Sequence, residues 1–388
     1  TARLSGASSW LHIQDFELDA AFELGLLPKN GWFHKFATNM ECWLLQRFDR
    51  VSSISVQMMS RLRTKNLSWE RSVYFPNWVD TEQIYPLPRP SCLKVRLGFK
   101  ENDQVVLYSG NMSSKQGLEL MLEVAVQLAN RSNVYFVLCG DGTARRRLES
   151  TAADLQLTNV RFLPLQPVED LNELLNLADV HALVQRDIVA DLVMPSKLTG
   201  MLASGRPVIA TASAGTAIAN VMSEADCGLI VRPGDPASFR AALEVMLANP
   251  DECRRWGDNG RNYVRMQFDK EQVLKAMTRQ LTSYSPARGG AGHVPGNTTG
   301  ARTPANFTRE ELLARISIDP DIYFGKPYIR GHYLWVSLVL DFLASGTTVE
   351  EILRRYPDLE ETDVRACIAY GAEMARERRI QVSLASEE

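Results

Sequence analysis

The sequence predicts an α/β protein built on a doubly wound parallel sheet. From Val105 to Val231, short apolar runs alternate with stretches of helical periodicity, the order expected of βαβ units. Runs such as "VYFVL" show no alternation of apolar and polar residues, which is typical of parallel strands covered by helices on both faces. Several runs end in a glycine loop that leads into a helix, as strands of such sheets often do.

The elements follow in order along the chain. Strands are expected at residues 105–109, 134–138, 160–163, 180–184, 207–211 and 228–231. Helices are expected between them at residues 118–129, 144–155, 168–177, 196–203 and 217–223. Three more helices are expected at residues 236–248, 251–267 and 270–284.

The rest of the chain divides around this sheet. Helical stretches at residues 16–24 and 32–48, and a strand and helix within "DRVSSISVQMMSRL", precede it. "YPLPRPSC" has three prolines and is a plausible hinge, and a Gly/Pro-rich stretch follows Tyr284. We therefore predict a partial N-terminal Rossmann domain at residues 1–85, a complete one at 86–284, a flexible linker at 285–306 and a small helical domain at 307–388.

Composition excludes several classes of protein. The formal charge of −3 gives no overall basic excess for binding nucleic acid. The six cysteines lie far apart without CxxC spacing, which indicates reduced thiols and no zinc site. No apolar run approaches the roughly 18 residues of a membrane span. We expect a cytoplasmic protein that at most touches a membrane surface.

Two loops carry the features of an anion site. Gly110 lets the backbone pass close to a ligand, the helix that follows points its positive N-terminus at the same place, and Lys115 adds a full charge. In "VMPSKLTG", Ser196 and Lys197 again stand at a helix start and would offer a hydroxyl, amides and a charge. The alternative for both loops is structural: a tight strand-to-helix turn and a solvated lysine.

A third glycine loop, "LCGDGTARRRL", follows the next strand. Gly140 and Gly142 would let this loop pass beneath a ribose or a base. The three arginines at residues 145–147 are expected on a solvated helix face.

Several ordered motifs together resemble the family 4 glycosyltransferases, retaining enzymes with the two-Rossmann GT-B fold. The motifs are "FPNWVDTEQIYPL", "YSGNMSSKQGLELMLEVA", "VLCGDGTARRRLE", "VRFLPLQP" and "MPSKLTGMLASGRPVIAT". With "WLHIQDFELDAAFELGLL", the sequence is similar to glycosyltransferases of colanic-acid and other exopolysaccharide biosynthesis. The resemblance covers roughly residues 8 to 284.

The resemblance implies transfer of a sugar from a nucleotide-diphosphate donor to a glycan or polyprenyl-linked acceptor, with retention and no metal or other cofactor. The diphosphate would lie against Gly110, Asn111 and Lys115, with Ser196 and Lys197 approaching from the neighbouring loop. Lysines and helix amides would stabilise the charge that the leaving nucleotide gains. The base and ribose would lie near the backbone of the residues Gly140, Gly142, Leu163 and Pro164.

On the N-terminal side, the resemblance places His12 and Asp15 at the interdomain cleft. His12 would contact the donor sugar or its diphosphate and is, with Lys115, the expected catalytic residue; a packed core histidine is the alternative. The stretch "WFHKFATNMECWLLQRF" carries apolar residues at helical spacing, for which we expect core packing, with contact to lipid or a membrane surface as the alternative.

The sequence departs from the family in three places. Asn111 stands near a common arginine, and the Glu-x7-Glu pair falls on Leu192 and Gly200, with Asp191 beside the first position as a possible sugar contact. About 85 residues precede the hinge, fewer than a whole N-terminal Rossmann domain. We therefore expect a truncated N-terminal domain, and our hypothesis is that this chain binds the donor nucleotide but is impaired in transfer.

The last segment, from "ISIDPDIYFGKPYIRG" to "EEILRRYPDLEETDVRACIAY", resembles antitoxin-like proteins of domain-of-unknown-function family 433. A helix stop at Gly346, followed by a cap at Thr347 or Thr348, and the similar "YPDLEETDV" predict two helices of a helix-turn-helix. Residues 307–388 hold 10 Lys and Arg against 15 Asp and Glu, so binding of a protein partner is as plausible as binding of DNA.

Three functions remain open from the sequence. The first is a hexosyl-type glycosyltransferase fused to an antitoxin-like module. The second is a catalytically impaired protein that binds nucleotide sugar and regulates through a tail that binds DNA or a toxin. The third is a nucleotide-sugar epimerase on the same scaffold, whose cleft carboxylates and histidines are not evident here.

Overall fold

The computed structural model describes residues 5, 7–23, 27–28, 31–186, 196–283, 307–318, 326–332, 334–344, 346–356 and 359–377. The chain forms two compact units. One comprises Ser9–Leu67 with Ser72–Met277, and the other Thr1–Ser8, Ser68–Arg71 and Thr278–Glu388. The predicted linker at residues 285–306 lies outside the described residues.

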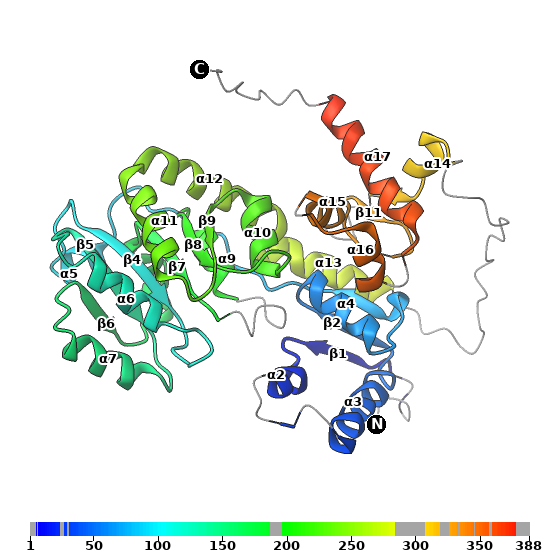
Figure 1. Ribbon diagram of the computed structural model, residues 1–388, viewed down its shortest axis with the longest axis horizontal. Coiled ribbons are helices and arrows are strands. Elements are labelled where there is room, and N and C mark those ends of the chain that lie inside the picture. The colour runs from blue at the N-terminus through cyan, green and yellow to red at the C-terminus, as the bar shows by residue number, and fades with distance from the viewer. Residues whose placement is uncertain are drawn as a thin grey trace. The chain divides into compact units, whose positions relative to one another are not determined.

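A six-stranded parallel sheet forms the larger part of the first unit (Figure 1), in the order β6-β5-β4-β7-β8-β9. Its strands are β4 (Gln104–Ser109), β5 (Val134–Cys139), β6 (Val160–Leu163), β7 (Val180–Leu183), β8 (Val208–Thr211) and β9 (Gly228–Val231). The chain runs outward from β4 to β6, returns to β7 beside β4, and then runs outward the other way. The predicted doubly wound sheet is confirmed, with strand bounds within one residue of the expected ones.

Helices connect and cover these strands, and the bounds of the predicted helices agree with the structure to within three residues. They are α5 (Cys92–Arg96), α6 (Glu119–Gln127), α7 (Arg145–Asp154), α8 (Leu171–Leu177), α9 (Lys197–Ala203), α10 (Ala217–Ala225), α11 (Pro236–Ala248), α12 (Pro250–Gln267) and α13 (Lys270–Ser283). Two 3-10 turns are η1 (Trp69–Arg71) and η2 (Val168–Asp170). Only α5, which follows the proline-rich stretch, was not expected from the sequence.

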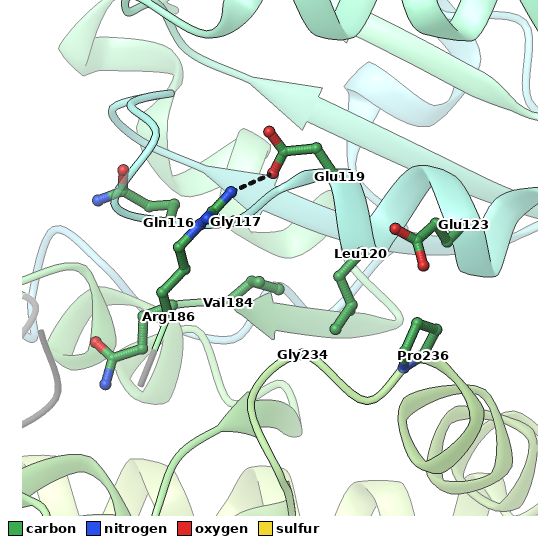
Figure 2. Close-up of a pocket in the computed structure, with 10 residues that line it drawn as sticks. Gln116, Gly117, Glu119, Leu120, Glu123, Val184, Arg186, Gly234 and Pro236 are labelled. Carbon is green, nitrogen blue, oxygen red and sulfur yellow. Dashed lines mark hydrogen bonds and ion pairs between the residues drawn. The ribbon is translucent and has the colours of Figure 1, made fainter. Parts of the chain in front are cut away.

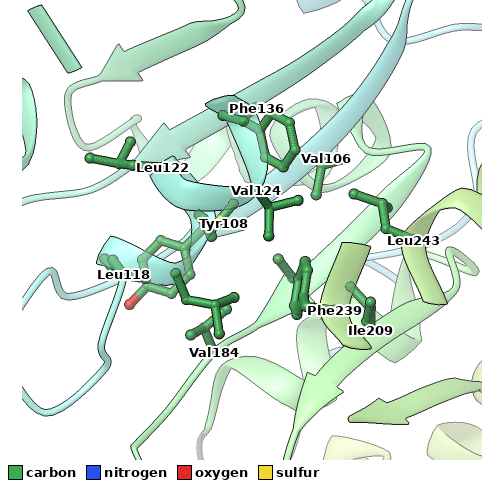
Figure 3. Packing of buried hydrophobic residues seen from close by; sticks show 14 of the residues in the cluster. Val106, Tyr108, Leu118, Leu122, Val124, Phe136, Val184, Ile209, Phe239 and Leu243 are labelled. Atoms are coloured by element: carbon green, nitrogen blue, oxygen red, sulfur yellow. The ribbon is translucent and has the colours of Figure 1, made fainter. Parts of the chain in front are cut away.

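The central strands of the sheet are buried on both faces, which explains their unbroken apolar runs. Alternate residues of β4 point to opposite faces. Val106 and Tyr108 join Phe136 and Phe239 in the larger cluster, between the sheet and helices α6, α7 and α11 (Figure 3). Val105 and Leu107 instead join a second cluster on the other face, with residues of α5 and α8.

A three-stranded parallel sheet, in the order β1-β2-β3, belongs to the same unit. Its strands are β1 (Trp10–Ile13), β2 (Arg50–Ser53) and β3 (Ser72–Tyr74), with helices α2 (Glu17–Glu23), α3 (Trp32–Leu45) and α4 (Val56–Thr64). Lys65, only 4% exposed, binds Asp19 of α2 at 3.0 Å and Glu41 of α3 at 2.5 Å. This lysine therefore fixes which side of α3 faces inward.

The expected core packing of α3 is wrong for most of its apolar residues. Ala37 and Leu45 are buried, on the same side as Glu41. The large side chains around the rest of the helix are exposed: Trp32, Phe33, Phe36, Met40, Trp43 and Leu44. Helical spacing alone could not separate the two sides, because both are apolar.

The second unit contains the small C-terminal fold. Its elements are α14 (Arg309–Leu313), β10 (Ile316–Ser317), β11 (Tyr328–Ile329), α15 (Val336–Ala344), α16 (Val349–Arg355) and α17 (Glu361–Glu377). Gly346 has φ +88, and Thr348 caps α16 through a capping box with Glu351, so the predicted helix stop and cap are confirmed.

Across the described helices of the whole chain, none has the length and apolarity that crossing a bilayer requires.

Candidate functional site

The centre of the large sheet is a topological switch point. β4 and β7 are neighbours, and the chain leaves their carboxyl ends in opposite directions. Ligands of open α/β sheets bind in the crevice outside such a pair of strand ends. The loop after β4 carries Gly110, Asn111 and Lys115, and the loop after β7 leads to Ser196 and Lys197.

The structure brings Gly110 and Lys197 together although 86 residues lie between them in the chain. Gly110 has φ +133, and a Cβ built on it would lie 3.5 Å from Lys197 Nζ. The missing side chain thus leaves room for the lysine to lie along the backbone of the first loop. The loop after β4 and the start of α9 therefore approach each other at Gly110.

Lys197 is held at this place by Tyr108 of β4. Its Nζ donates a hydrogen bond of 2.9 Å to the phenolic oxygen and lies 4.1 Å from the centroid of the ring. Burial lowers the pKa of Lys197 to about 8. Within the described residues no carboxylate forms an ion pair with this amine. An incoming anion would therefore supply the charge partner that this part of the chain does not.

Lys115 and Ser196 lie at the surface. Both side chains are exposed, and Ser196 precedes α9 without capping it through its side chain. The carbonyl of Lys115 accepts a hydrogen bond of 3.1 Å from the amide of Arg186, which ties the first loop to the end of β7. Both side chains are thus available to a ligand.

The two glycines of the third loop serve close packing. A Cβ on Gly140 would lie 1.9 Å from the carbonyl oxygen of Gly110, and one on Gly142 would lie 2.5 Å from Asn111 Oδ1. Only glycine permits this approach of the two loops. What Gly140 and Gly142 contact is therefore the first loop itself.

Arg145 corrects the expectation of a solvated arginine face. Its guanidinium donates to the carbonyl oxygens of Gly140 and, at 2.8 Å, of Leu163. The carbonyl of Pro164 accepts from Cys139 Sγ at 3.2 Å. The carbonyl oxygens of Leu163 and Pro164 therefore already accept hydrogen bonds from side chains of the protein. The sequence pattern did not indicate that the Arg145 side chain contacts this loop.

A cavity of about 210 Å³ lies at the same edge of the sheet (Figure 2). The turn before α6, the end of β7 and the loop before α11 line it with the residues Gln116, Gly117, Glu119, Leu120, Glu123, Val184, Gln185, Arg186, Gly234 and Pro236. Arg186 Nη2 lies 3.5 Å from Glu119 Oε2, and the buried Nε2 of Gln185 has no hydrogen-bond partner in the described structure. Sequence reasoning missed these residues, although they directly follow a predicted strand end.

His12 and Asp15 lie at the carboxyl end of β1. Gln14 Nε2 donates to His12 Nε2 at 2.8 Å, so Nδ1 donates to Ser52 Oγ, also at 2.8 Å. Burial lowers the pKa of His12, which makes a neutral imidazole the main form at pH 7. The ring also packs edge-on to Phe75 at 5.1 Å.

Asp15 is sensitive to the charge of Lys115. Burial is the main effect and raises the pKa of Asp15, Glu17 raises it further, and Lys115 lowers it. The carboxylate and the loop lysine are therefore electrostatically coupled. Asp191, the other expected sugar contact, lies outside the described residues. Among the described residues, no group of three His, Cys, Asp or Glu is arranged to hold a metal ion.

Comparisons with known families match two segments. Residues 93–263 match the family described as "Glycosyl transferases group 1", and residues 316–371 match "Protein of unknown function (DUF433)". The first segment contains the switch point, the loops and the cavity. The second contains the small C-terminal fold.

Individual proteins are similar over longer stretches. The chain is 35% identical over 285 residues to the colanic acid biosynthesis glycosyl transferase WcaI of Escherichia coli, covering 72% of this chain and 69% of that protein. It is 26% identical over 224 residues to the lipopolysaccharide core biosynthesis glycosyltransferase LpsE of Rhizobium meliloti, covering 57% and 61%.

Among solved structures, the fold is similar to Anabaena Alr3699/HepE, whose crystal structure holds UDP and glucose. The TM-score is 0.60 at 17% identity, over 73% of each chain. Sucrose-phosphate synthase from Thermosynechococcus elongatus gives a TM-score of 0.56 at 21% identity, over 73% of this chain and 71% of that one. These similarities show the GT-B-like fold.

Proposed function

We propose that this chain, which belongs to the group 1 glycosyltransferase family, transfers a hexosyl-type sugar with retention from a nucleotide-diphosphate donor. The acceptor is a glycan or a polyprenyl-linked glycan of exopolysaccharide or cell-surface polysaccharide synthesis. The reaction takes place in the cytoplasm, at the inner face of the membrane. The observation that carries the proposal is the half-buried amine of Lys197 beside Gly110 at the switch point.

The chemistry of transfer suits this arrangement. When the bond between the sugar and the diphosphate breaks, negative charge accumulates on the leaving nucleotide. Lys197 is already oriented by Tyr108, so it need not reorganise to meet this charge. Lys115 adds a second positive charge from the loop after β4. With these two cations and the adjacent amides, we propose that the reaction needs no metal ion.

The N-terminal residues would act on the sugar side. A neutral His12, oriented by Ser52 and Gln14, can donate or accept a hydrogen bond without adding charge. Asp15, coupled to Lys115, would contact a sugar hydroxyl close to the diphosphate. The base and ribose would lie over the third loop, near Gly142 and Leu163.

A second candidate function is supported by Gly200. Its position matches a family glutamate, and a Cβ built there would meet Leu175 Cδ1 at 3.5 Å. Glycine offers no carboxylate to hold the donor at this position. This favours a protein that binds nucleotide sugar with little turnover and acts through residues 307–388, which would bind DNA or a protein partner.

The test is donor binding and transfer by the full chain and by Lys197→Met. Calorimetry with a panel of UDP-, GDP-, ADP- and dTDP-sugars identifies the donor. Loss of the cation should weaken binding by about ten- to a hundredfold, the worth of a hydrogen bond to a charged group. Lys275→Met, an exposed lysine of α13, is the matched control and should bind normally.

The outcomes separate the two functions. Donor binding with release of labelled sugar onto an acceptor extract supports the transferase. Donor binding without transfer supports the regulatory candidate. If no donor binds, or if both lysine variants bind alike, the assignment of the site is wrong.

A further inference from the structure

The exposed side of α3 is an apolar feature of the described residues that the proposed reaction does not use. Trp32 is 78% exposed, Phe36 56% and Trp43 53%. Their spacing, with residues at i, i+3 or i+4 and i+7, places them on one side of the helix. We call this surface the aromatic face of α3; its members are Trp32, Phe33, Phe36, Met40, Trp43 and Leu44.

The aromatic face borders the side of α3 that packs into the protein. Ala37 and Leu45 are buried, and Glu41 is bound by Lys65 at 2.5 Å. The helix is therefore already anchored by its inner side. Soluble monomers rarely expose a contiguous apolar patch of more than a few hundred Å², and larger ones mark interaction surfaces.

The exposed charged side chains from Trp32 to Arg47 are both basic. Lys35 and Arg47 are exposed, and the Arg47 guanidinium lies 4.4 Å from the centroid of the Trp43 ring. Glu41 is the one acidic residue between Trp32 and Arg47 in the sequence, and Lys65 binds it on the inner side. The surface thus combines aromatic residues with two exposed basic side chains.

We propose that the aromatic face of α3 binds the surface of a membrane that contains anionic lipid. Tryptophan prefers the interface between headgroups and hydrocarbon, and basic residues are attracted to anionic headgroups. A helix of 14 residues is about 21 Å long, shorter than the roughly 30 Å hydrocarbon core. The helix therefore lies in the interface, with its aromatic side about 5–10 Å deep.

A second copy of the chain fits this surface less well. In a twofold contact the same patch faces itself, so Lys35 and Arg47 of both copies would gather at one apolar interface. No acidic residue of the aromatic face would compensate them. A bilayer with anionic lipid provides both an apolar layer, from its acyl chains, and the opposite charge, from its headgroups.

The aromatic face of α3 would provide the contact that places the proposed enzyme at the membrane. This contact does not depend on sugar transfer. His12 lies on β1, which belongs to the same compact unit as α3. Binding through α3 would hold this part of the chain at the bilayer, where a polyprenyl-linked acceptor is found.

The test is co-sedimentation of the full chain with vesicles of phosphatidylcholine alone or mixed with phosphatidylglycerol. We expect binding to the mixed vesicles and a blue shift of tryptophan fluorescence. Trp32→Ser/Phe36→Ser/Trp43→Ser should reduce binding at least about tenfold, since burial of each ring is favourable. Lys35→Glu/Arg47→Glu should remove the preference for phosphatidylglycerol.

The matched control is Leu165→Ser/Val168→Ser, which removes two side chains that are 68% and 71% exposed near the large sheet. This variant should bind vesicles like the unchanged chain. Circular dichroism checks that each variant folds, and Trp32→Ser alone replaces the triple variant if that one does not.

Three results would overturn the proposal. The first is an unchanged chain that does not bind mixed vesicles, and the second is an equal loss in the control variant. The third is self-association in sedimentation velocity that the triple variant abolishes, which would assign the aromatic face to a second copy. Loss of transfer activity with intact vesicle binding would contradict only the proposed function.

Discussion

Tyr108 and Lys197 form a hydrogen bond of 2.9 Å between the end of β4 and the start of α9. Tyr108 is fully buried, and its hydroxyl donates in turn to the carbonyl oxygen of Asn111 at 2.5 Å. One phenol thus connects the lysine of the second loop to the backbone of the first. The position of the amine is determined by the core of the sheet, so the site is formed before any ligand arrives.

Donor affinity is predicted to fall as the pH rises above about 8. Burial lowers the pKa of Lys197 to about 8, and a bound diphosphate would raise it again. The free protein then loses the proton at a pH at which the complex still holds it. Affinity for the nucleotide sugar should be constant below that pH and decrease by up to about tenfold per unit above it.

Calorimetry with a nucleotide sugar between pH 6.5 and about 9.5 measures this dependence, since the esterified diphosphate has no second proton to lose near neutral pH. Lys197→Met should bind weakly and show no such decline. A decline that persists in this variant would assign the titration to another group.

Gly140→Ala is predicted to destabilise the first unit by about 2–4 kcal/mol. The new Cβ would lie 1.9 Å from the carbonyl oxygen of Gly110, and φ is +148. The two loops would have to separate, so donor affinity should fall as well. Urea unfolding followed by tryptophan fluorescence gives the change in the free energy of unfolding.

Gly98→Ala is the control for this substitution. Gly98 also has a positive φ, +69, but nothing lies within 4 Å of the added carbon. It should cost about 1–2 kcal/mol, the backbone penalty alone, and leave donor binding unchanged. Equal costs at the two positions would show that the close approach of the loops is unimportant.

Arg145→Met is predicted to cost about 1–3 kcal/mol, because the carbonyls of Gly140 and Leu163 lose their guanidinium donor. Donor affinity should fall a few-fold through the altered third loop. Arg146→Met, on the exposed side of α7, should stay within about 0.5 kcal/mol. The same urea experiment measures the free energy of unfolding of both variants. Similar losses in Arg145→Met and Arg146→Met would show that Arg145 behaves as the solvated side chain expected from the sequence.

The fold of the large sheet could be predicted because its central strands are buried on both faces. Residues such as Val105 and Val106 point to opposite clusters, so an unbroken apolar run specifies a covered parallel strand. Gly110 and Lys197 could be placed near each other because both follow strands of one sheet. The positions of residues that follow strands depend on the order of the strands in the sheet. The alternation of strands and helices along the sequence indicates this order.

Other features depend on contacts that no local pattern shows. Tyr108 reads as one more apolar residue of a strand, and its hydroxyl bond to Lys197 arises only when β4 and α9 meet. Arg145 has the spacing of a surface residue, yet its long side chain reaches two carbonyls of other segments. The exposed side of α3 is as apolar as a core-facing one, so burial could not be assigned without Lys65 and Glu41.

The last prediction concerns the C-terminal unit, in which Arg315→Met should destabilise the fold by about 3 kcal/mol. Asp363 is buried, and Arg315 Nη1 binds its Oδ1 at 2.7 Å. Without the guanidinium the carboxylate would lack its nearest full positive charge in the described part of this unit. Arg309→Met is the control, because Arg309 pairs with Glu373 at the surface, where such pairs contribute about 1 kcal/mol or less.

Hydrogen exchange of the α17 amides in the full chain reports this unit alone. Exchange should accelerate strongly in Arg315→Met and little in Arg309→Met. Equal acceleration in the two variants would show that the buried ion pair does not hold α17 in place.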